Sequence, residues 1–173
     1  MKGKPLVFIS ACLGFAPCRY DGKKEKFPLP KPYRKRIKFL PFCPEEAIGL
    51  GTPRLPIRII QRGKRQRLIQ PETGLDLTRR IKEWSEGFLK EVESLKAKNN
   101  SCAIGFLLKS GSPSCALRDA KIYSAPEGKR FIKKGSGFFG RVVLKRFKNY
   151  PIFDERELEL KGRGIFLKLL EGR

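Results

Sequence analysis

Four short apolar runs predict buried strands. They cover residues 5–11, 37–42, 103–108 and 150–153, and together they favour β-branched and aromatic side chains. Residues 57–68 differ because Ile and Arg alternate there, a pattern that predicts an edge ribbon. All of these runs are much shorter than the roughly 20 residues that a membrane-spanning helix needs. We therefore expect no transmembrane segment.

One long helix is predicted over residues 78–98. Apolar side chains recur there at steps of three or four and fall on one helical face: Leu77, Ile81, Trp84, Phe88, Val92 and Leu95. We expect Trp84 to be a core residue. Shorter helical patterns follow at residues 142–147 and 158–170. Strands that alternate with helices predict an α/β fold with a mainly parallel sheet, and the length favours a single domain over residues 1–173.

The chain is strongly basic. Lys and Arg number 39 against 17 Asp and Glu, a net charge of +22. Such an excess repels itself unless an anion lies nearby, so a nucleic acid is the expected partner. A lysine-rich thermophilic surface is the alternative, but thermophilic proteins enrich Glu together with Lys and the acids here are few.

Histidine is absent, and this excludes Ser-His-Asp and Cys-His catalysis and every metal site that needs imidazole. The chain has five cysteines. Lys2 and Lys4 precede an apolar run, which superficially resembles an export signal, but the run has the character of a first strand. We therefore expect a cytoplasmic protein whose thiols are reduced or bound to a metal.

Three of the cysteines follow predicted strands. Cys12 and Cys43 come directly after the first two, and Cys115 ends the short loop after the third. The carboxyl ends of parallel strands meet at one edge of a sheet, so these thiols should converge. Thiolates without His and without a Cys-x-x-Cys pair favour an iron–sulfur cluster, with zinc as the competitor. Cys102 precedes the third strand and is expected to be structural, and Cys18 is either a further ligand or a free thiol.

Candidate catalytic groups lie beside these thiols. Glu45 is two residues beyond Cys43, and Ser110, Ser112 and Ser114 precede Cys115. A carboxylate and a hydroxyl beside a metal can position and deprotonate a water. The structural alternative for Glu45 is a cap on the following helical turn.

Several motifs together resemble the thiouracil desulfidase (TudS-like) family over nearly the whole chain. They occur in the family's order: Cys12-Leu-Gly-Phe-Ala-Pro-Cys18-Arg-Tyr-Asp-Gly22, Phe42-Cys43-Pro44-Glu45, Gly49-Leu-Gly-Thr-Pro-Arg54, Lys109 with Ser112-Pro-Ser-Cys115, and Phe153-Asp-Glu155. The chain departs from the family at Cys12-Leu-Gly, at Ala116 and around Tyr123, in what should be the wall of the site.

The resemblance implies a Rossmann-like three-layer α/β domain with a 4Fe–4S cluster. By the matching motifs, Cys12, Cys43 and Cys115 would bind the cluster, and one iron would lack a protein ligand. Glu45 would be the catalytic acid/base, Ser112 the likeliest serine by its place in the motif, and Cys18 would not ligate. The implied activity is non-redox removal of sulfur from thiolated pyrimidines.

Two questions stay open at this stage. The substrate is either thiouridine in tRNA or free thiouracil, with hydrogen sulfide released in both cases, and the basic stretches 31–38 and 58–67 could hold tRNA phosphates. The alternative function is a non-catalytic RNA-binding protein that zinc or an iron–sulfur cluster stabilises.

Overall fold

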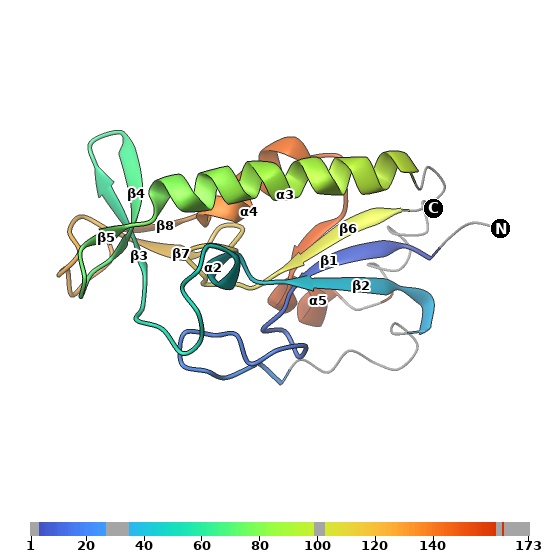
Figure 1. The fold of residues 1–173 in the computed structure, drawn as a ribbon, viewed down its shortest axis with the longest axis horizontal. Helices are drawn as coiled ribbons and strands as arrows, with labels where there is room; N and C mark the ends of the chain where they lie inside the picture. The colour runs from blue at the N-terminus through green and yellow to red at the C-terminus, as the bar shows by residue number, and fades with distance from the viewer. Residues whose placement is uncertain (1–3, 27–34, 99–102, 162–163, 165–173) are drawn as a thin grey trace.

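The four predicted buried strands form one parallel sheet. The computed structural model describes residues 4–26, 35–98, 103–161 and 164. Sheet A has the order β2-β1-β6-β9, from β1 (Leu6–Ser10), β2 (Lys38–Phe42), β6 (Ile104–Leu108) and β9 (Ile152–Asp154), with every neighbouring pair parallel (Figure 1). The predicted α/β class with a mainly parallel sheet is confirmed.

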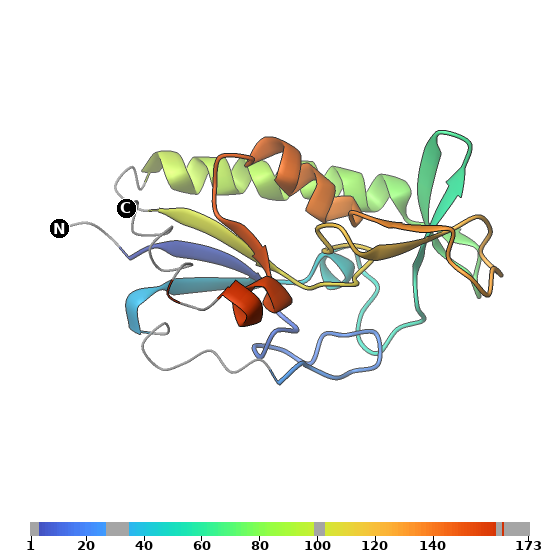
Figure 2. The same ribbon diagram turned by 180° about the vertical axis from the view of Figure 1, so that it is seen from behind.

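Helices cover both faces of sheet A and give the expected three layers. Leu6 and Phe8 of β1 pack against α3 (Thr78–Lys98) and α4 (Phe138–Arg146). Val7 and Ile9 point the other way, into a cluster that contains Leu158 of α5 (Glu155–Lys161). Figure 2 shows α3 and α4 on one side of the sheet and α5 on the other. Alternate residues of β1 thus face different helices, which explains why its apolar run is continuous.

Helix α3 has its predicted bounds, and Trp84 packs in the core as expected. Its ring lies 4.9 Å from that of Phe88 and 5.3 Å from that of Phe139, between centroids. Helix α4 begins at Phe138, four residues before the predicted start at Val142. Residues 162–163 and 165–170 of the predicted C-terminal helix, residues 31–34 of the basic stretch 31–38, and Cys102 lie outside the described residues. None of the helices in the described ranges combines the length and apolar character that crossing a membrane requires.

The predicted edge ribbon is wrong in its placement. Residues 58–70 form the hairpin β3 (Arg58–Arg62) and β4 (Arg65–Gln70), but β3 lies in the middle of a second sheet. Sheet B has the order β5-β4-β3-β7-β8, with the additional strands β5 (Leu75–Asp76), β7 (Ala120–Tyr123) and β8 (Lys133–Gly135). These additional strands have only two to four residues, and β7 pairs with the distant β3, so local periodicity did not indicate them.

Helix α3 supports both sheets. Its second half packs on sheet A through Leu89 and Val92, whereas Ile81 in its first half packs on sheet B against Ile59 and Leu68. Figure 1 shows α3 running along both sheets, with the short helix α2 (Pro44–Ala47) between them.

The start of α4 packs against the backbone of residues 113–116. The backbone N–H groups of Phe138 and Phe139 donate to the carbonyls of Pro113 (3.0 Å) and Ser114 (2.9 Å). A Cβ at Gly140 would lie 2.3 Å from the carbonyl oxygen of Ala116, so a side chain cannot fit there. Glycine at this position lets the helix fix the loop that carries Cys115.

Replacing Gly140 with Ala should therefore destabilise the fold. The added methyl meets backbone that cannot move aside, and we expect a loss of about 1–3 kcal/mol in the free energy of unfolding. Gly87→Ala is the matched control, because Gly87 lies in α3 with open space around its Cα and the change should stabilise by up to about 1 kcal/mol. Urea denaturation measures the free energy of unfolding of both variants. Equal shifts in the same direction would contradict the close approach of α4 to the backbone of residues 113–116.

Candidate active site

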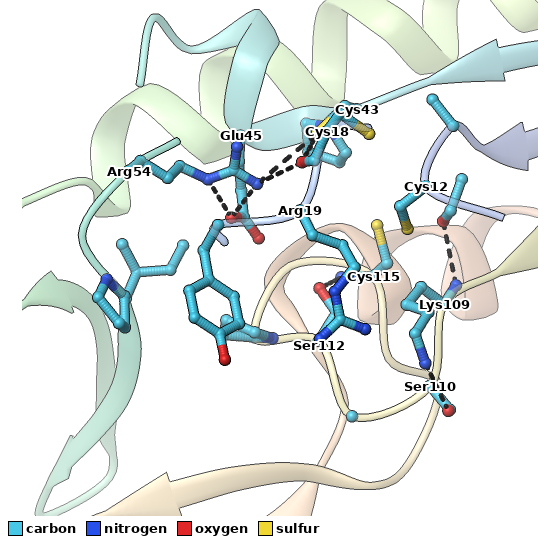
Figure 3. A pocket seen from close by; sticks show the side chains of 18 of the residues that line it. Cys12, Cys18, Arg19, Cys43, Glu45, Arg54, Lys109, Ser110, Ser112 and Cys115 are labelled. Carbon is cyan, nitrogen blue, oxygen red and sulfur yellow. Dashed lines mark hydrogen bonds and ion pairs between the residues drawn. The ribbon is translucent and has the colours of Figure 1, made fainter. Parts of the chain in front are cut away.

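The candidate ligands converge on one cavity at the carboxyl ends of sheet A. Strands β1, β2 and β6 are in parallel register and end at Ser10, Phe42 and Leu108, so the residues that follow them share one edge. The cavity there has a volume of about 490 Å³ and is lined by Cys12, Cys18, Cys43 and Cys115, together with Glu45 and Ser112 (Figure 3). The structure therefore brings together all the residues that the sequence proposed for the site.

The thiols influence one another. The sulfurs of Cys18 and Cys43 and a carboxylate oxygen of Glu46 lie within 4.8 Å of one another. The hydrogen bond that Cys18 shares with Cys12, together with burial, raises the pKa of the Cys18 thiol to about 12. A hydrogen bond to Cys18 and then burial raise the pKa of Cys43, and burial raises that of Cys115. Without a metal these thiols hold their protons, and a metal ion would displace them on binding.

The spacing of the thiols bears on the kind of metal centre. Ligand sulfurs of one tetrahedral zinc lie roughly 4 Å apart, since each Zn–S bond is about 2.3 Å. Within the described part of the chain, Cys12, Cys43 and Cys115 do not form a group as compact as that of Cys18 and Cys43. These three thiols line the same cavity, and a set of thiolates without imidazole fits an iron–sulfur cluster.

Glu45 is held by a buried ion pair. It is the second residue of α2, and its relative exposure is 8%. Its Oε2 accepts a hydrogen bond from Nε of Arg54 (2.8 Å) and forms an ion pair with Nη2 of Arg54 at 2.7 Å. The hydroxyl of Ser114 donates to Oε1 at 2.9 Å. Burial alone would lower the pKa of Arg54, but the neighbouring carboxylate of Glu45 raises it above its ordinary value. The carboxylate therefore has a fixed orientation beside the thiols.

The three serines have different environments. Ser114 is completely buried and holds Glu45, whereas the hydroxyl of Ser110 donates to Glu155 at 2.5 Å. Ser112 lines the cavity, and its Oγ accepts the backbone N–H groups of Ser114 (3.1 Å) and Cys115 (3.0 Å). These two bonds occupy both acceptor sites of Ser112 and leave its own O–H to donate elsewhere.

Arg54 is the functional residue that the sequence did not assign. Besides holding Glu45, Nη2 donates to the carbonyl of Cys18 at 2.9 Å, and Nη1 donates to that of Gly51 at 2.8 Å. It thus ties the cysteine loop to α2. The signal was present in the Gly49-Leu-Gly-Thr-Pro-Arg54 motif, but nothing in the spacing indicated that Arg54 turns back toward Glu45.

A second buried ion pair fixes the loop after β6. Lys109 Nζ lies 2.5 Å from Glu155 Oε1, and the backbone N–H of Ser110 donates to Oε2 at 2.8 Å. The backbone N–H of Lys109 also donates to Ser10 Oγ at 3.0 Å, which joins this loop to the end of β1. The serine and cysteine segment is thus held from α5 and from β1 as well as from α4.

Comparison with known proteins decides the family. The family model described as 2-thiouracil desulfurase matches residues 7–155. The chain belongs to this family. A curated relative is the uncharacterized protein YbbK of Bacillus subtilis (strain 168), 31% identical over 159 residues, or 88% of this chain and 97% of YbbK. The resemblance drawn from the sequence motifs is confirmed.

A solved structure supports the same assignment. The [4Fe–4S]-dependent thiouracil desulfidase TudS is similar with a TM-score of 0.65 and 30% sequence identity, over 95% of this chain and 99% of that one. Both comparisons extend across the fold and across the cavity that holds the family's motifs.

The Glu155 ion pair predicts a loss of stability in acid. Burial alone would raise the pKa of Glu155, but the hydrogen bonds from Lys109 and Ser110 outweigh burial and hold it below its ordinary value. The contribution of Glu155 to the free energy of unfolding is therefore complete above about pH 4.3, the ordinary pKa of Glu. This contribution is lost as the pH falls through the lowered pKa.

Glu155→Gln should lower the free energy of unfolding by about 2 kcal/mol at neutral pH, because it removes the carboxylate 2.5 Å from Lys109 Nζ and leaves Lys109 with the more distant carboxylate of Glu25, at 3.9 Å. The same variant should flatten the acid part of the stability–pH curve, measured by urea denaturation from pH 3 to 7. Glu91→Gln, an exposed position on α3, is the control. If the stability of Glu155→Gln fell with decreasing pH as steeply as that of the unaltered protein, the role given to the Glu155 ion pair would be contradicted.

Proposed function

We propose that the protein is an iron–sulfur-dependent desulfidase that removes sulfur from thiolated pyrimidines by hydrolysis and releases hydrogen sulfide. Its substrate would be thiouridine in tRNA or free thiouracil. Family membership and the match to TudS support the class of activity. The observation that carries the proposal for this chain is that one cavity is lined by four thiols and by Glu45, whose carboxylate is fixed in place.

Cys12, Cys43 and Cys115 would hold a 4Fe–4S cluster. When bound, the cluster would supply an iron without a protein ligand, a soft Lewis acid suited to a thiocarbonyl sulfur. The convergence of these three thiols on one cavity supports that ligand set. Cys18 would remain a protonated neighbour that donates to the site.

Glu45 would take a proton from the attacking water. Each carboxylate oxygen has two acceptor positions, and Oε1 uses one for Ser114, so the other remains for water. Arg54 and Ser114 would keep that oxygen directed into the cavity and spare the carboxylate any reorganisation during the reaction.

Ser112 would act as a hydrogen-bond donor. Its Oγ accepts two backbone N–H groups, and its side chain shares a hydrogen bond with the Cys115 thiol. With substrate bound, its hydroxyl hydrogen would donate to the oxygen that forms on the pyrimidine. Water supplies that oxygen, the C=S bond breaks, and the two protons of water leave with the sulfur. No net oxidant or reductant is consumed.

The alternative function has its own support. Cys18, Cys43 and Glu46 are compact enough to hold one ion, which a zinc-stabilised RNA-binding protein without catalysis would need. Iron and acid-labile sulfide content after anaerobic purification separates the two functions. A colourless protein that contains zinc would overturn the desulfidase proposal.

Single cysteine replacements test the ligand set. Cys12→Ser, Cys43→Ser and Cys115→Ser should each lose the visible iron–sulfur absorbance and most of the bound iron, because a missing thiolate leaves an iron exposed. Cys18→Ser is the matched control and should keep both. Loss of the cluster in Cys18→Ser, with retention in Cys12→Ser, would show that Cys18 and not Cys12 is the cluster ligand.

Replacing Glu45 tests the role of the carboxylate. Glu45→Gln should retain the cluster absorbance and reduce kcat for sulfide release from 4-thiouracil by about 10²–10⁴-fold, the usual contribution of a general base. Glu91→Gln makes the same chemical change on an exposed face of α3 and should leave kcat unchanged. Full activity of Glu45→Gln with an intact cluster would exclude the assigned role.

A further inference from the structure

The two faces of sheet B differ in composition. Residues paired across a ladder share a face, so Ile59, Leu68 and Ile122 lie together, and they form the core face that packs under α3. Their neighbours along each strand point the other way. This outer face of sheet B carries six cations: Arg58, Arg62, Arg65, Arg67, Lys121 and Lys134.

Two pairs of these cations lie directly opposite each other. Arg62 pairs with Arg65 beside the hairpin turn, and Lys121 pairs with Lys134 between β7 and β8. Like charges at directly opposed positions destabilise a sheet. All four residues are exposed, so solvent and salt weaken the repulsion between them. The opposed pairs still contribute nothing to the stability of the fold.

Acidic side chains do not balance this face. Arg67 forms an ion pair with Asp76 at 3.2 Å. Among the described residues, the other five cations on the face have no carboxylate within ion-pair distance. The charges are therefore available to an external anion, which would also relieve the repulsion between the opposed pairs.

The outer face continues into the cavity. Arg58, Lys121 and Tyr123 belong to this face and also line the cavity of the candidate active site. Arg58 stacks over the ring of Tyr123 at 4.5 Å and donates to the carbonyls of Pro126 and Gly128, both at 2.9 Å. These contacts hold Arg58 in place beside the cavity. The cations of the outer face thus extend from the hairpin turn to the cavity, with the buried Ile60 between Arg62 and Arg58 on β3.

We propose that the outer face of sheet B binds the phosphate backbone of RNA and presents a thiolated base to the cavity. This inference rests on the proposed function, since it takes the cavity to be the site for a thiolated pyrimidine. Among polyanions, nucleic acids carry such a base on a chain of phosphates, which matches a cationic face joined to that cavity. The charge then serves to bind the substrate, and the thiols and Glu45 serve its chemistry.

The test uses the anaerobically purified protein with its metal bound, and a fluorescently labelled tRNA transcript. Arg62→Gln/Arg65→Gln should weaken tRNA binding about tenfold and reduce the slope of log Kd against log salt by about 2, because each arginine would neutralise one phosphate. Neither residue lines the cavity, so sulfide release from free 4-thiouracil should not change. Lys90→Gln/Lys98→Gln, on the exposed side of α3, removes the same charge and should leave tRNA binding close to that of the unaltered protein.

A third variant separates binding from folding. Arg65→Glu places a carboxylate opposite Arg62, so it should raise the thermal midpoint of the protein while it weakens tRNA binding more than the neutral change does. A structural role for Arg65 would instead lower the midpoint.

The outcomes distinguish the two proposals. Equal tRNA affinity in Arg62→Gln/Arg65→Gln and in the α3 control, or absence of binding at physiological salt, would overturn the RNA surface and favour free thiouracil as substrate. The desulfidase proposal would survive that result if 4-thiouracil is turned over. Salt-dependent tRNA binding through Arg62 and Arg65, without sulfide release from any thiolated substrate, would uphold the surface and contradict the enzyme.

Discussion

The parallel register of β1 between β2 and β6 is the constraint on which the site depends. It places Ser10, Phe42 and Leu108 at one edge, so three segments far apart in sequence enter the same space. Helices cover both faces of this sheet, and the edge is the direction left open for a ligand. The thiols are then buried by the fold and do not need closely spaced sequence pairs to meet. The absence of a Cys-x-x-Cys motif follows from this architecture.

A close ion pair with little exposure to solvent lies on each of two sides of the cavity. Arg54 and Glu45 pair in a nearly solvent-free position, with side-chain exposures of 4% and 11%, and each has further hydrogen bonds. Lys109 and Glu155 do the same at the loop after β6. Burying such pairs gives little net stability by itself. These pairs instead fix orientation, since each joins a short helix, α2 or α5, to a loop that lines the cavity.

The sequence predicted the part of the fold that local patterns control. The four strands of sheet A and helix α3 have strong periodicity, and the position of Cys12 and Cys43 after strands was enough to place their thiols at one edge. Sheet B was missed because β5, β7 and β8 are very short and because the pairing of β3 with β7 joins distant segments, as for Ile59 with Ile122. Arg54 was missed for a related reason, since its contact with Glu45 depends on the path of the intervening loop. The separate environments of Ser110, Ser112 and Ser114 follow from the packing of α4 and α5.

The position of the charge in the fold changes what the net charge of +22 means. A uniformly basic surface would be consistent with general solubility or with a thermophilic composition. Opposed pairs such as Arg62 with Arg65 are a different matter, because a one-residue change to an acid on either strand would turn repulsion into attraction. A sheet face that keeps such pairs beside a cavity mouth lacks the ion pairs that a stabilising charge network needs. The arrangement is therefore consistent with the proposed RNA surface, on which the charge of this chain would serve to bind its substrate.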